Sequence, residues 1–546
     1  MRKNFKQAKK NFFLLQEETG AVFKDHGGKL RICLIYPNTY YTGMSNLGFR
    51  LVYYYLNLRA DVVCERAFLP DGVFKHSDDV DNCALLSLES QRPLSYFDIL
   101  AFSVSFENDY PNIVKILNMA GVPPRTSNRN AEYYPIVIMG GVCAFMNPEP
   151  VCEFFDVVCL GEAEVLLDVF IDTYLSSDDK GEFLHSLSQK DGFYIPALFG
   201  IEYDNDGTIK RRLNYGEKIQ IKKLTAENLN TCGAFNQLVT PHTEFADMHL
   251  IELMRGCQWR CRFCAVSSIY GSVRKKDKEY VINEINYVKT KGKRIGLIAP
   301  SMTDYPNICE LLGQEDVDFS ITSLRSTKKV AELIPFIRKK TSISIAPEAG
   351  SKRLREVIKK NISHEDIIDT ARLIFDSSIN TLRLYFIVGL PTETTEDIYA
   401  MIALIKEIRG LSKKGDIVLS INTFVPKPFT PFQWHNMEAI AVIKERLKIL
   451  KQGLKGVRVK VFHDMPKYAY MQGLFSLGDR RVAAVIEAFA LCGDWLRACE
   501  EVGVDYQFYV YRKKDFTEAL PWDFIANSVE KYNLWNEYVK IKDLKG

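Results

Sequence analysis

Short apolar runs that alternate with helix-length amphipathic segments occupy most of the chain, and they occur in two separate series. Parallel strands need long crossover connections, which are usually helices, so this alternation predicts parallel sheets with helices packed on their faces. The runs span residues 31–36, 61–64, 98–104, 135–139 and 156–160 in the first series, and residues 248–254, 294–299, 317–322, 342–346, 381–388 and 417–424 in the second.

The two series predict an α/β protein of four parts. Residues 1–180 are expected to form a doubly wound, Rossmann-like parallel sheet, and residues 248–455 a partial (β/α)6 barrel that resembles a TIM barrel. Residues 181–247 are predicted to be a linker containing a hairpin around Gly207. Residues 456–546 begin with the strand-like VRVKVF and are expected to continue as a mainly helical region.

Composition excludes several classes of protein. The chain has 546 residues, which is enough to bury a core without disulfide or metal support, and 47% of them are hydrophobic, as in soluble globular proteins. A formal net charge of +3 does not indicate nucleic acid or a membrane surface as a partner. No apolar run is long enough to span a membrane, and the start lacks a signal peptide, so a cytoplasmic protein is expected.

Cys257, Cys261 and Cys264 form a CxxxCxxC loop directly after the first strand of the second series. The other ten of the 13 cysteines lack metal-type spacing and are expected to be buried free thiols. Three soft thiolates can hold three irons of a [4Fe–4S] cluster and leave the fourth iron open to a chelating ligand. A closed zinc site would need a fourth protein ligand; no histidine lies between Cys257 and His364, and the nearest other cysteines are Cys232 and Cys309.

Polar, glycine-containing segments follow the strands of the first series. They include YPNTYYTGMSNLG, GGVCAFMNPEP and GEAE, which contribute Gly43, Gly48, Gly140, Gly141 and Gly161. Ligands of open parallel sheets bind beyond the carboxyl ends of the strands, where glycine lets backbone approach a ligand closely. Ordinary strand-to-helix turns would explain the same glycines, so the sequence leaves both interpretations open.

The cysteine loop resembles that of the radical SAM superfamily, CxxxCx(aromatic)C, with Phe263 at the aromatic position. The resemblance implies that the open iron is chelated by the amino and carboxylate groups of S-adenosylmethionine (SAM). One electron from the reduced cluster would then produce methionine and a 5′-deoxyadenosyl radical that abstracts a substrate hydrogen. It also implies a one-electron donor, such as flavodoxin or ferredoxin, as a partner.

The same resemblance assigns SAM contacts to the other strand ends of the barrel. Pro300 and Ser301 stand where the superfamily usually has a Gly-Gly-Glu-like segment, so this contact departs from the pattern. Arg325 is a candidate clamp for a carboxylate, Glu348 for the ribose hydroxyls, and Gly389 for the neighbourhood of the adenine. For Arg325 and Glu348, an ordinary surface position is the alternative; for Gly389, a turn.

The whole chain resembles radical SAM proteins with an N-terminal domain of the cobalamin-binding type. The segments that carry this resemblance include CERAFLPD, APEAGSKRLR, GLPTET, FVPKPFTPFQW, GDRR and LPWDFI. Classical cobalamin domains have an Asp-x-His-x-x-Gly segment, which is missing from the first domain, so a bound cobalamin would have no lower axial histidine from the protein. The cobalamin contacts implied are Asn38, Gly43, Ser45, Asn46, Gly140, Gly141, Gly161 and Glu162.

The leading hypothesis is a cobalamin-dependent radical SAM enzyme that modifies an unactivated carbon of its substrate, with methyl transfer as the preferred reaction. The main alternative is a radical SAM enzyme without cobalamin, whose first domain recognises RNA, a peptide or a lipid as substrate. A third hypothesis is a non-enzymatic protein that binds a cluster or zinc. The sequence does not identify the substrate.

Three further segments have polar or aromatic patterns with more than one interpretation. Lys427 and the basic run 274–278 are expected at a solvated surface. The aromatic residues of 424–434 could form a substrate lip or part of the core, with the core more common. Residues 479–481, Asp-Arg-Arg, could hold a phosphate or form internal ion pairs.

Overall fold

The computed structural model describes residues 2–71, 84–129, 134–216, 220–233, 237–292, 294–314, 317–321, 323–337 and 342–541. Of the ten cysteines expected as buried thiols, Cys83 lies outside these residues. The other nine are free, and six of them are buried. Within the described ranges, no helix combines the length and the apolar character needed to cross a membrane.

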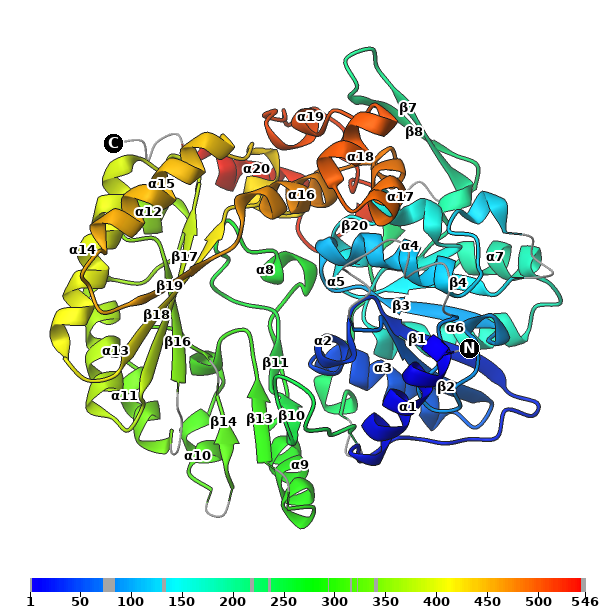
Figure 1. Ribbon diagram of the computed structural model, residues 1–546, viewed down its shortest axis with the longest axis horizontal. Helices are drawn as coiled ribbons and strands as arrows, with labels where there is room; N and C mark the ends of the chain where they lie inside the picture. The colour runs from blue at the N-terminus through cyan, green and yellow to red at the C-terminus, as the bar shows by residue number, and fades with distance from the viewer. Residues whose placement is uncertain are drawn as a thin grey trace.

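The first series forms a doubly wound sheet, as predicted. In the described residues its strand order is β2-β1-β3-β4-β5-β6, and β1 to β5 are parallel, which is the flavodoxin-like arrangement (Figure 1). The strands are β1 Leu30–Tyr36, β2 Val62–Phe68, β3 Ile99–Ser103, β4 Ile136–Gly140, β5 Val157–Cys159 and β6 Phe193–Tyr194.

Helices bury both faces of this sheet, and the alternation of side chains along each strand decides which face each residue serves. Ile32 and Leu34 of β1 share a core with the α3–α6 side, whereas Cys33 and Ile35 share one with α4 and with the C-terminal α17. The helices of this half are α1 Arg2–Gln16, α2 Tyr40–Met44, α3 Leu47–Leu58, α4 Tyr110–Met119, α5 Val142–Met146, α6 Ala163–Leu175 and α7 Lys180–Ser188.

Part of the predicted linker belongs to the first sheet. Its segment Phe193–Tyr194 is β6, which pairs antiparallel with β5 at the sheet edge. The hairpin expected around Gly207 is present and consists of β7 Phe199–Tyr203 and β8 Ile209–Asn214. Farther along, β9 Ile221–Lys222 pairs in parallel with β20 Ile525–Ala526 from the C-terminal region.

The second series forms the parallel wall of a partial barrel, as predicted (Figure 1). The third apolar run contributes the short strand β14, which pairs with β13, and a further short strand, β15, begins directly after the run and pairs with β16. VRVKVF supplies β19, which extends the wall beside β18. The strands are β10 Met248–Glu252, β13 Arg294–Ile298, β14 Phe319–Ser320, β15 Ser323–Leu324, β16 Ser342–Glu348, β17 Thr381–Val388, β18 Asp416–Thr423 and β19 Lys460–His463.

Helices cover the outside of the barrel wall (Figure 1). Helix α13 begins with a complete capping box at Ser363, and helix α14 with one at Thr394, in agreement with the sequence signal of a Ser or Thr followed three residues later by Asp. The helices are α9 Lys278–Thr290, α10 Ile308–Leu312, α11 Val330–Leu333, α12 Lys352–Val357, α13 His364–Asp376, α14 Thr395–Leu411 and α15 Ile440–Gly453.

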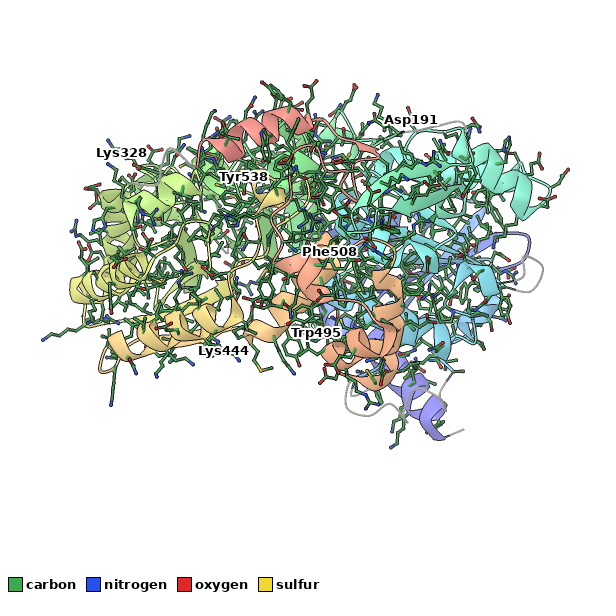
Figure 2. The ribbon with its side chains drawn as sticks, turned by 90° about the horizontal axis from the view of Figure 1, so that it is seen from above. Asp191, Lys328, Lys444, Trp495, Phe508 and Tyr538 are labelled. Carbon is green, nitrogen blue, oxygen red and sulfur yellow. The ribbon has the colours of Figure 1, made fainter. Side chains whose placement is uncertain are left out.

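The C-terminal region is mainly helical, as predicted, and it lies along the join between the two halves. Figure 2 shows this layer with Trp495 and Phe508 labelled. Phe429, Phe432 and Trp434 of the preceding aromatic segment are buried, in agreement with a core role. The helices are α16 Pro466–Leu477, α17 Val482–Cys492, α18 Trp495–Val502, α19 Tyr506–Val510 and α20 Lys531–Val539.

One surface prediction was wrong, and another holds only in part, since Lys275 and Asp277 of the run 274–278 are exposed. Lys427 is largely buried and pairs at 2.5 Å with Glu107, which follows β3. In the run 274–278, Arg274 pairs with Glu162 at 2.7 Å, and Lys276 is buried beside Glu284. The partners of Lys427 and Arg274 lie far away in the sequence, so a local charge pattern could not reveal them, whereas Glu284 is eight residues from Lys276. Of the two possibilities for residues 479–481, the structure shows internal ion pairs, such as Arg481–Asp479 at 2.6 Å.

Gly141, directly after β4, allows a close approach of two backbone segments. Its φ is +96°, and a Cβ atom there would lie 2.5 Å from the carbonyl oxygen of Val104. A Cβ at the preceding Gly140 would meet nothing within 4 Å.

We therefore expect Gly141→Ala to lower the free energy of unfolding by at least about 1–2 kcal/mol, since its positive φ alone carries such a penalty, and Gly140→Ala to lower it much less. Chemical denaturation followed by circular dichroism checks this, and equal effects of the two substitutions would contradict it.

Candidate active site between the two sheets

A cavity of about 480 Å³ lies at the carboxyl ends of the first sheet and reaches the barrel. Its sheet side consists of alternate residues of β1, β3 and β4, such as Leu34, Ala101 and Ile138, under α3 and α6. Ile298, at the end of β13, and Tyr270 line it from the barrel side. The lining is mostly apolar, and the volume is in the range of about 300–1,000 Å³ that is typical of small-molecule sites.

Five of the eight predicted cobalamin contacts line this cavity: Asn46, Gly140, Gly141, Gly161 and Glu162. Gly140 leaves open space for a ligand, as its free Cβ position shows. Gly141 and Gly161 instead allow two backbone segments to pack closely. A Cβ at Gly141 would lie 2.5 Å from the carbonyl oxygen of Val104, and one at Gly161 would lie 2.4 Å from that of Leu224. Asn46 caps α3 by accepting a hydrogen bond from Phe49 N at 3.0 Å.

The other three predicted contacts are not among the described residues that line the cavity. Asn38 donates a hydrogen bond from Nδ2 to the buried Asp109 at 2.7 Å, and burial raises the pKa of this carboxyl to about 7. Gly43 is buried in α2 against Phe68. The Ser45 hydroxyl accepts a hydrogen bond from the backbone of Glu244. All three therefore have structural partners outside the cavity.

The three clustered cysteines lie in the segment 256–273, here called the cluster loop, between β11 Met254–Arg255 and β12 Arg274–Lys275. Each of the three is half-buried, and Cys264 N donates to the carbonyl oxygen of Cys261 at 3.1 Å. Burial raises the pKa of the Cys264 thiol to about 11 and also raises that of Cys257. Iron would have to displace these protons, as metals do when they bind thiols.

Two neighbours of the cysteines anchor the loop to the barrel mouth. Arg262 donates to the carbonyl oxygens of Glu356 at 3.0 Å and Val357 at 2.8 Å, at the end of α12, and forms an ion pair with Glu537 of α20 at 3.3 Å. Phe263 packs against an apolar cluster that includes Leu354, Leu390 and Phe432. The aromatic position of the motif thus has a packing role.

A ring of polar groups surrounds the loop at the strand ends. Arg325 stacks on the Trp259 ring, with its guanidinium carbon 3.8 Å from the ring centroid. Trp259 Nε1 donates to Asp304 at 2.5 Å. Arg325 was a predicted site residue, whereas Trp259 and Asp304 were not. The tryptophan inside the cysteine motif was a local signal that could have revealed a stacking partner.

Glu348, at the end of β16, pairs with Lys360 at 3.0 Å, and the side chains of both residues are only 11–12% exposed. Burial raises the pKa of Glu348, although Lys360 acts in the opposite direction. The charge of Lys360 also lowers the pKa of the Cys264 thiol, against the larger effect of burial. No motif in the sequence marks this lysine as a site residue.

The remaining SAM candidates differ in accessibility. Pro300 is exposed, whereas Ser301 is buried with its hydroxyl 3.4 Å from that of Thr303. Gly389 has a φ of +88°, and its N–H donates to Glu393 at 2.7 Å. Glu393 in turn pairs with Arg446 at 2.9 Å. The backbone after β17 is therefore fixed by a buried ion pair.

Among the described residues, no three His, Cys, Asp or Glu side chains are placed to hold a single metal ion. A tetrahedral zinc site requires such convergence on one ion. A [4Fe–4S] cluster has a different requirement, since each thiolate binds a different iron.

Fold and site together define a two-part α/β protein with a three-thiolate loop at the mouth of a parallel barrel and a cavity beside it. Residues 48–196 match the family model described as radical SAM proteins, N-terminal, and residues 251–405 match that of the radical SAM superfamily. An uncharacterized protein of Methanocaldococcus jannaschii is 30% identical over 463 residues, which is 84% of this chain and 90% of that protein. The chain belongs to the radical SAM superfamily, whose members use a [4Fe–4S] cluster and SAM.

More distant similarities cover parts of the chain. The threonylcarbamoyladenosine tRNA methylthiotransferase of Aquifex aeolicus is 24% identical over 219 residues, 37% of this chain and 52% of that enzyme. Among solved structures, the apo form of the cobalamin-dependent SAM radical enzyme OxsB has a TM-score of 0.45 and 19% identity, covering 69% of this chain and 51% of that one.

Glu348 has a left-handed backbone with φ +65°, which is unfavourable for a residue with a side chain. Both Glu348→Gly and Glu348→Ala remove the partner of Lys360, so the difference between them isolates the backbone strain. We expect the Gly variant to be more stable than the Ala variant by about 1 kcal/mol, although glycine is normally the less stable choice in a strand. Denaturant unfolding of both variants measures this, and an Ala variant as stable as the Gly variant would exclude strain at this position.

Proposed function

We propose that this protein is a radical SAM enzyme whose [4Fe–4S] cluster is held by Cys257, Cys261 and Cys264. When bound, the cluster supplies the electron that cleaves SAM reductively and so generates a 5′-deoxyadenosyl radical at the barrel mouth. The observation that supports this site is the anchored loop itself. Arg262 and Phe263 are the two residues between Cys261 and Cys264, and their contacts hold the loop against α12. The cysteines are therefore presented from a rigid segment.

The strand ends around the loop would hold SAM. Arg325 is positioned for the carboxylate of SAM, because its guanidinium is stacked on Trp259 and its Nε is buried without a hydrogen-bond partner among the described residues. Glu348 would accept hydrogen bonds from the ribose, with Lys360 keeping its carboxylate charged. Ser301 and Gly389 would border the ligand from β13 and β17, and the exposed Pro300 would stand at the rim.

We further propose that the cavity binds cobalamin and that the enzyme transfers a methyl group to an unactivated carbon of its substrate. The single observation that carries this is an apolar cavity at the carboxyl ends of a flavodoxin-like sheet, extending to the barrel. The residues fit an inserted part of such a group, which as a whole is larger than the cavity, since Gly140 leaves room in the wall and Asn46 provides a polar edge. Among the described lining residues there is no histidine, so the corrinoid would lack a lower axial histidine from this wall.

The alternative occupant is an apolar part of the substrate, such as a lipid chain or a peptide side chain. The apolar lining of the cavity favours such a group over RNA, whose phosphates require cations. In that case the radical chemistry at the barrel mouth would be the same, and the first domain would serve substrate recognition. A one-electron donor such as flavodoxin or ferredoxin would be needed for either reaction.

Single Cys257→Ala, Cys261→Ala and Cys264→Ala variants test the cluster site. Anaerobic reconstitution should give about four irons per chain in the wild type, and each variant should lose most of the iron and all reductive cleavage of SAM, because the cluster loses one of its three thiolates. Cys309→Ala is the matched control, since this half-buried cysteine lies outside the loop. Iron, sulfide and 5′-deoxyadenosine are measured, and wild-type values in all three variants would overturn the assignment.

Gly140→Val tests the cavity, because the added side chain projects into it. After incubation with hydroxocobalamin and gel filtration, the wild type should retain about one corrinoid per chain and the variant much less, while both keep their iron and their SAM cleavage. Gly410→Val is the control, since Gly410 is exposed in α14 and also has open space around it. A wild type that retains no corrinoid would assign the cavity to substrate, and corrinoid binding by Gly140→Val at the wild-type level would place the corrinoid elsewhere.

A further inference from the structure

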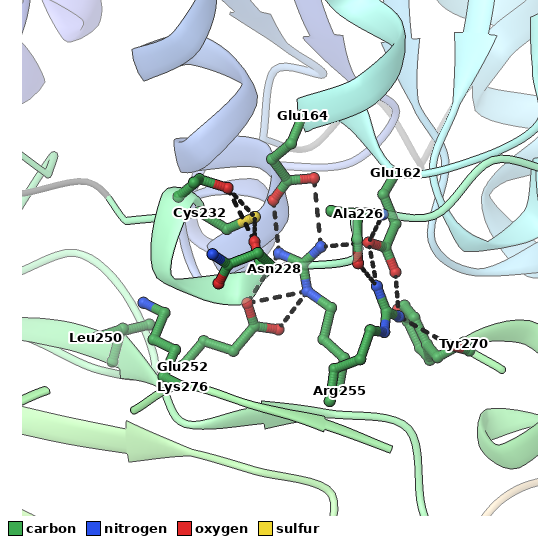
Figure 3. A network of polar contacts seen from close by, with 12 residues as sticks. Glu162, Glu164, Ala226, Asn228, Cys232, Leu250, Glu252, Arg255, Tyr270 and Lys276 are labelled. Atoms are coloured by element: carbon green, nitrogen blue, oxygen red, sulfur yellow. Dashed lines mark hydrogen bonds and ion pairs between the residues drawn. The ribbon is translucent and has the colours of Figure 1, made fainter. Parts of the chain in front are cut away.

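Glu162 stands directly before α6 in the first half of the molecule, yet its carboxylate pairs with the barrel. It accepts hydrogen bonds from Arg255 Nη1 at 2.9 Å and from Arg274 Nη2 and Nη1 at 2.7 and 2.9 Å (Figure 3). Its Oε2 atom also accepts a hydrogen bond from Ala226 N at 2.9 Å. The side chain is only 4% exposed. One buried carboxylate thus binds two guanidinium groups from another part of the chain.

The two arginines occupy equivalent positions at the two ends of the cluster loop. Arg255 is the last residue of β11, two residues before Cys257, and Arg274 is the first residue of β12. They face each other in the antiparallel β11–β12 pair. Glu162 therefore holds the point where the cluster loop begins and the point where it ends.

Further carboxylates hold Arg255, at the beginning of the cluster loop, more firmly than Arg274 at its end. Arg255 also pairs with Glu164 at 2.6 Å and with Glu252 at 2.8 Å. Arg274, in contrast, forms an ion pair with Glu162 alone among the described residues. Burial alone would raise the pKa of Glu162, but the two arginines hold it below its usual value, so the carboxylate is charged. Loss of its charge would leave Arg274 without a carboxylate.

Most of the hydrogen-bonding capacity of Glu162 is used within the protein. Its Oε2 atom accepts from Arg255 Nη1, Arg274 Nη1 and Ala226 N, and its Oε1 atom accepts from Arg274 Nη2. Glu162 and Arg255 nevertheless form part of the cavity wall. The same contact thus borders the cavity on one side and fixes the cluster loop on the other.

We propose that Glu162 is a positioning residue that clamps both ends of the cluster loop to the cavity wall, and so sets the place of the cluster relative to the occupant of the cavity. The identity of the cluster rests on the proposed function. The clamp itself is a property of the protein without cofactors, which allows the two to be tested separately.

Hydrogen–deuterium exchange of the full-length protein without cofactors tests the clamp. In Glu162→Gln, amides at both ends of residues 256–273 should exchange about tenfold faster or more, since a charge-assisted hydrogen bond is worth at least such a factor in an opening equilibrium. Arg274→Lys keeps the charge but loses the forked contact, and it should show the same change to a smaller extent. If Glu162→Gln does not fold, Arg274→Lys provides the test of the clamp in its place.

Glu149→Gln is the matched control. Glu149 is likewise buried between two arginines, Arg212 and Arg480, each at 3.1 Å, but these do not flank the cluster loop. This variant should lose stability to a similar degree and leave exchange in residues 256–273 unchanged. Unchanged loop exchange in Glu162→Gln, or an equal increase in Glu149→Gln, would overturn the proposal.

A second measurement uses reconstituted protein. Glu162→Gln should keep its iron, but the electron paramagnetic resonance spectrum of the reduced cluster with SAM and its midpoint potential should differ from the wild type, whereas Glu149→Gln should match the wild type. Identical spectra and potentials in Glu162→Gln and the wild type would overturn the positioning role. A wild type that binds no iron would instead overturn the proposed function, and the exchange result would still decide on the clamp.

Discussion

Buried carboxylates at the carboxyl end of the first sheet determine how the rest of the molecule is assembled. Glu107 follows β3, Glu149 follows β4 and Glu162 follows β5, and each pairs with cations from later parts of the chain. A buried charge without its partner is strongly destabilising, by about 3–5 kcal/mol, so each pair favours one docking geometry over others. The barrel and the C-terminal region are thereby fixed against the sheet end where the cavity lies.

Apolar packing complements these ion pairs. A parallel sheet must be covered on both faces, and here α17 of the C-terminal region helps α4 to cover one of them, as part of a single core. The opposite face, under α3 and α6, is where the cavity forms. The two faces of one sheet thus have separate tasks: one joins the parts of the molecule, and the other provides the ligand space.

The sequence predicted the architecture well because period, strand length and connection length are local signals. The cysteine loop was recognisable from its spacing, and five of the eight residues expected to contact cobalamin line the cavity, while the ligand contacts themselves stay a prediction. The sequence missed β6 because a two-residue strand at a sheet edge has no period to detect. Lys427, Arg274 and Lys360 were misjudged or missed since their roles depend on carboxylates distant in the sequence or on burial, which composition does not report. Trp259 was missed although it lies inside the recognised motif.

The contact between the cluster loop and α20 has a consequence for the biogenesis of the protein. Glu537 of α20 pairs with Arg262 at 3.3 Å and with Lys359 at 3.2 Å, so a segment translated long after the cysteines completes their surroundings. Chains emerge from the ribosome in order, and their early parts begin to fold first. A chain that has not yet been extended past α20 would therefore present a looser cysteine loop than the folded protein, so the surroundings of the cysteines become complete only after α20 has emerged.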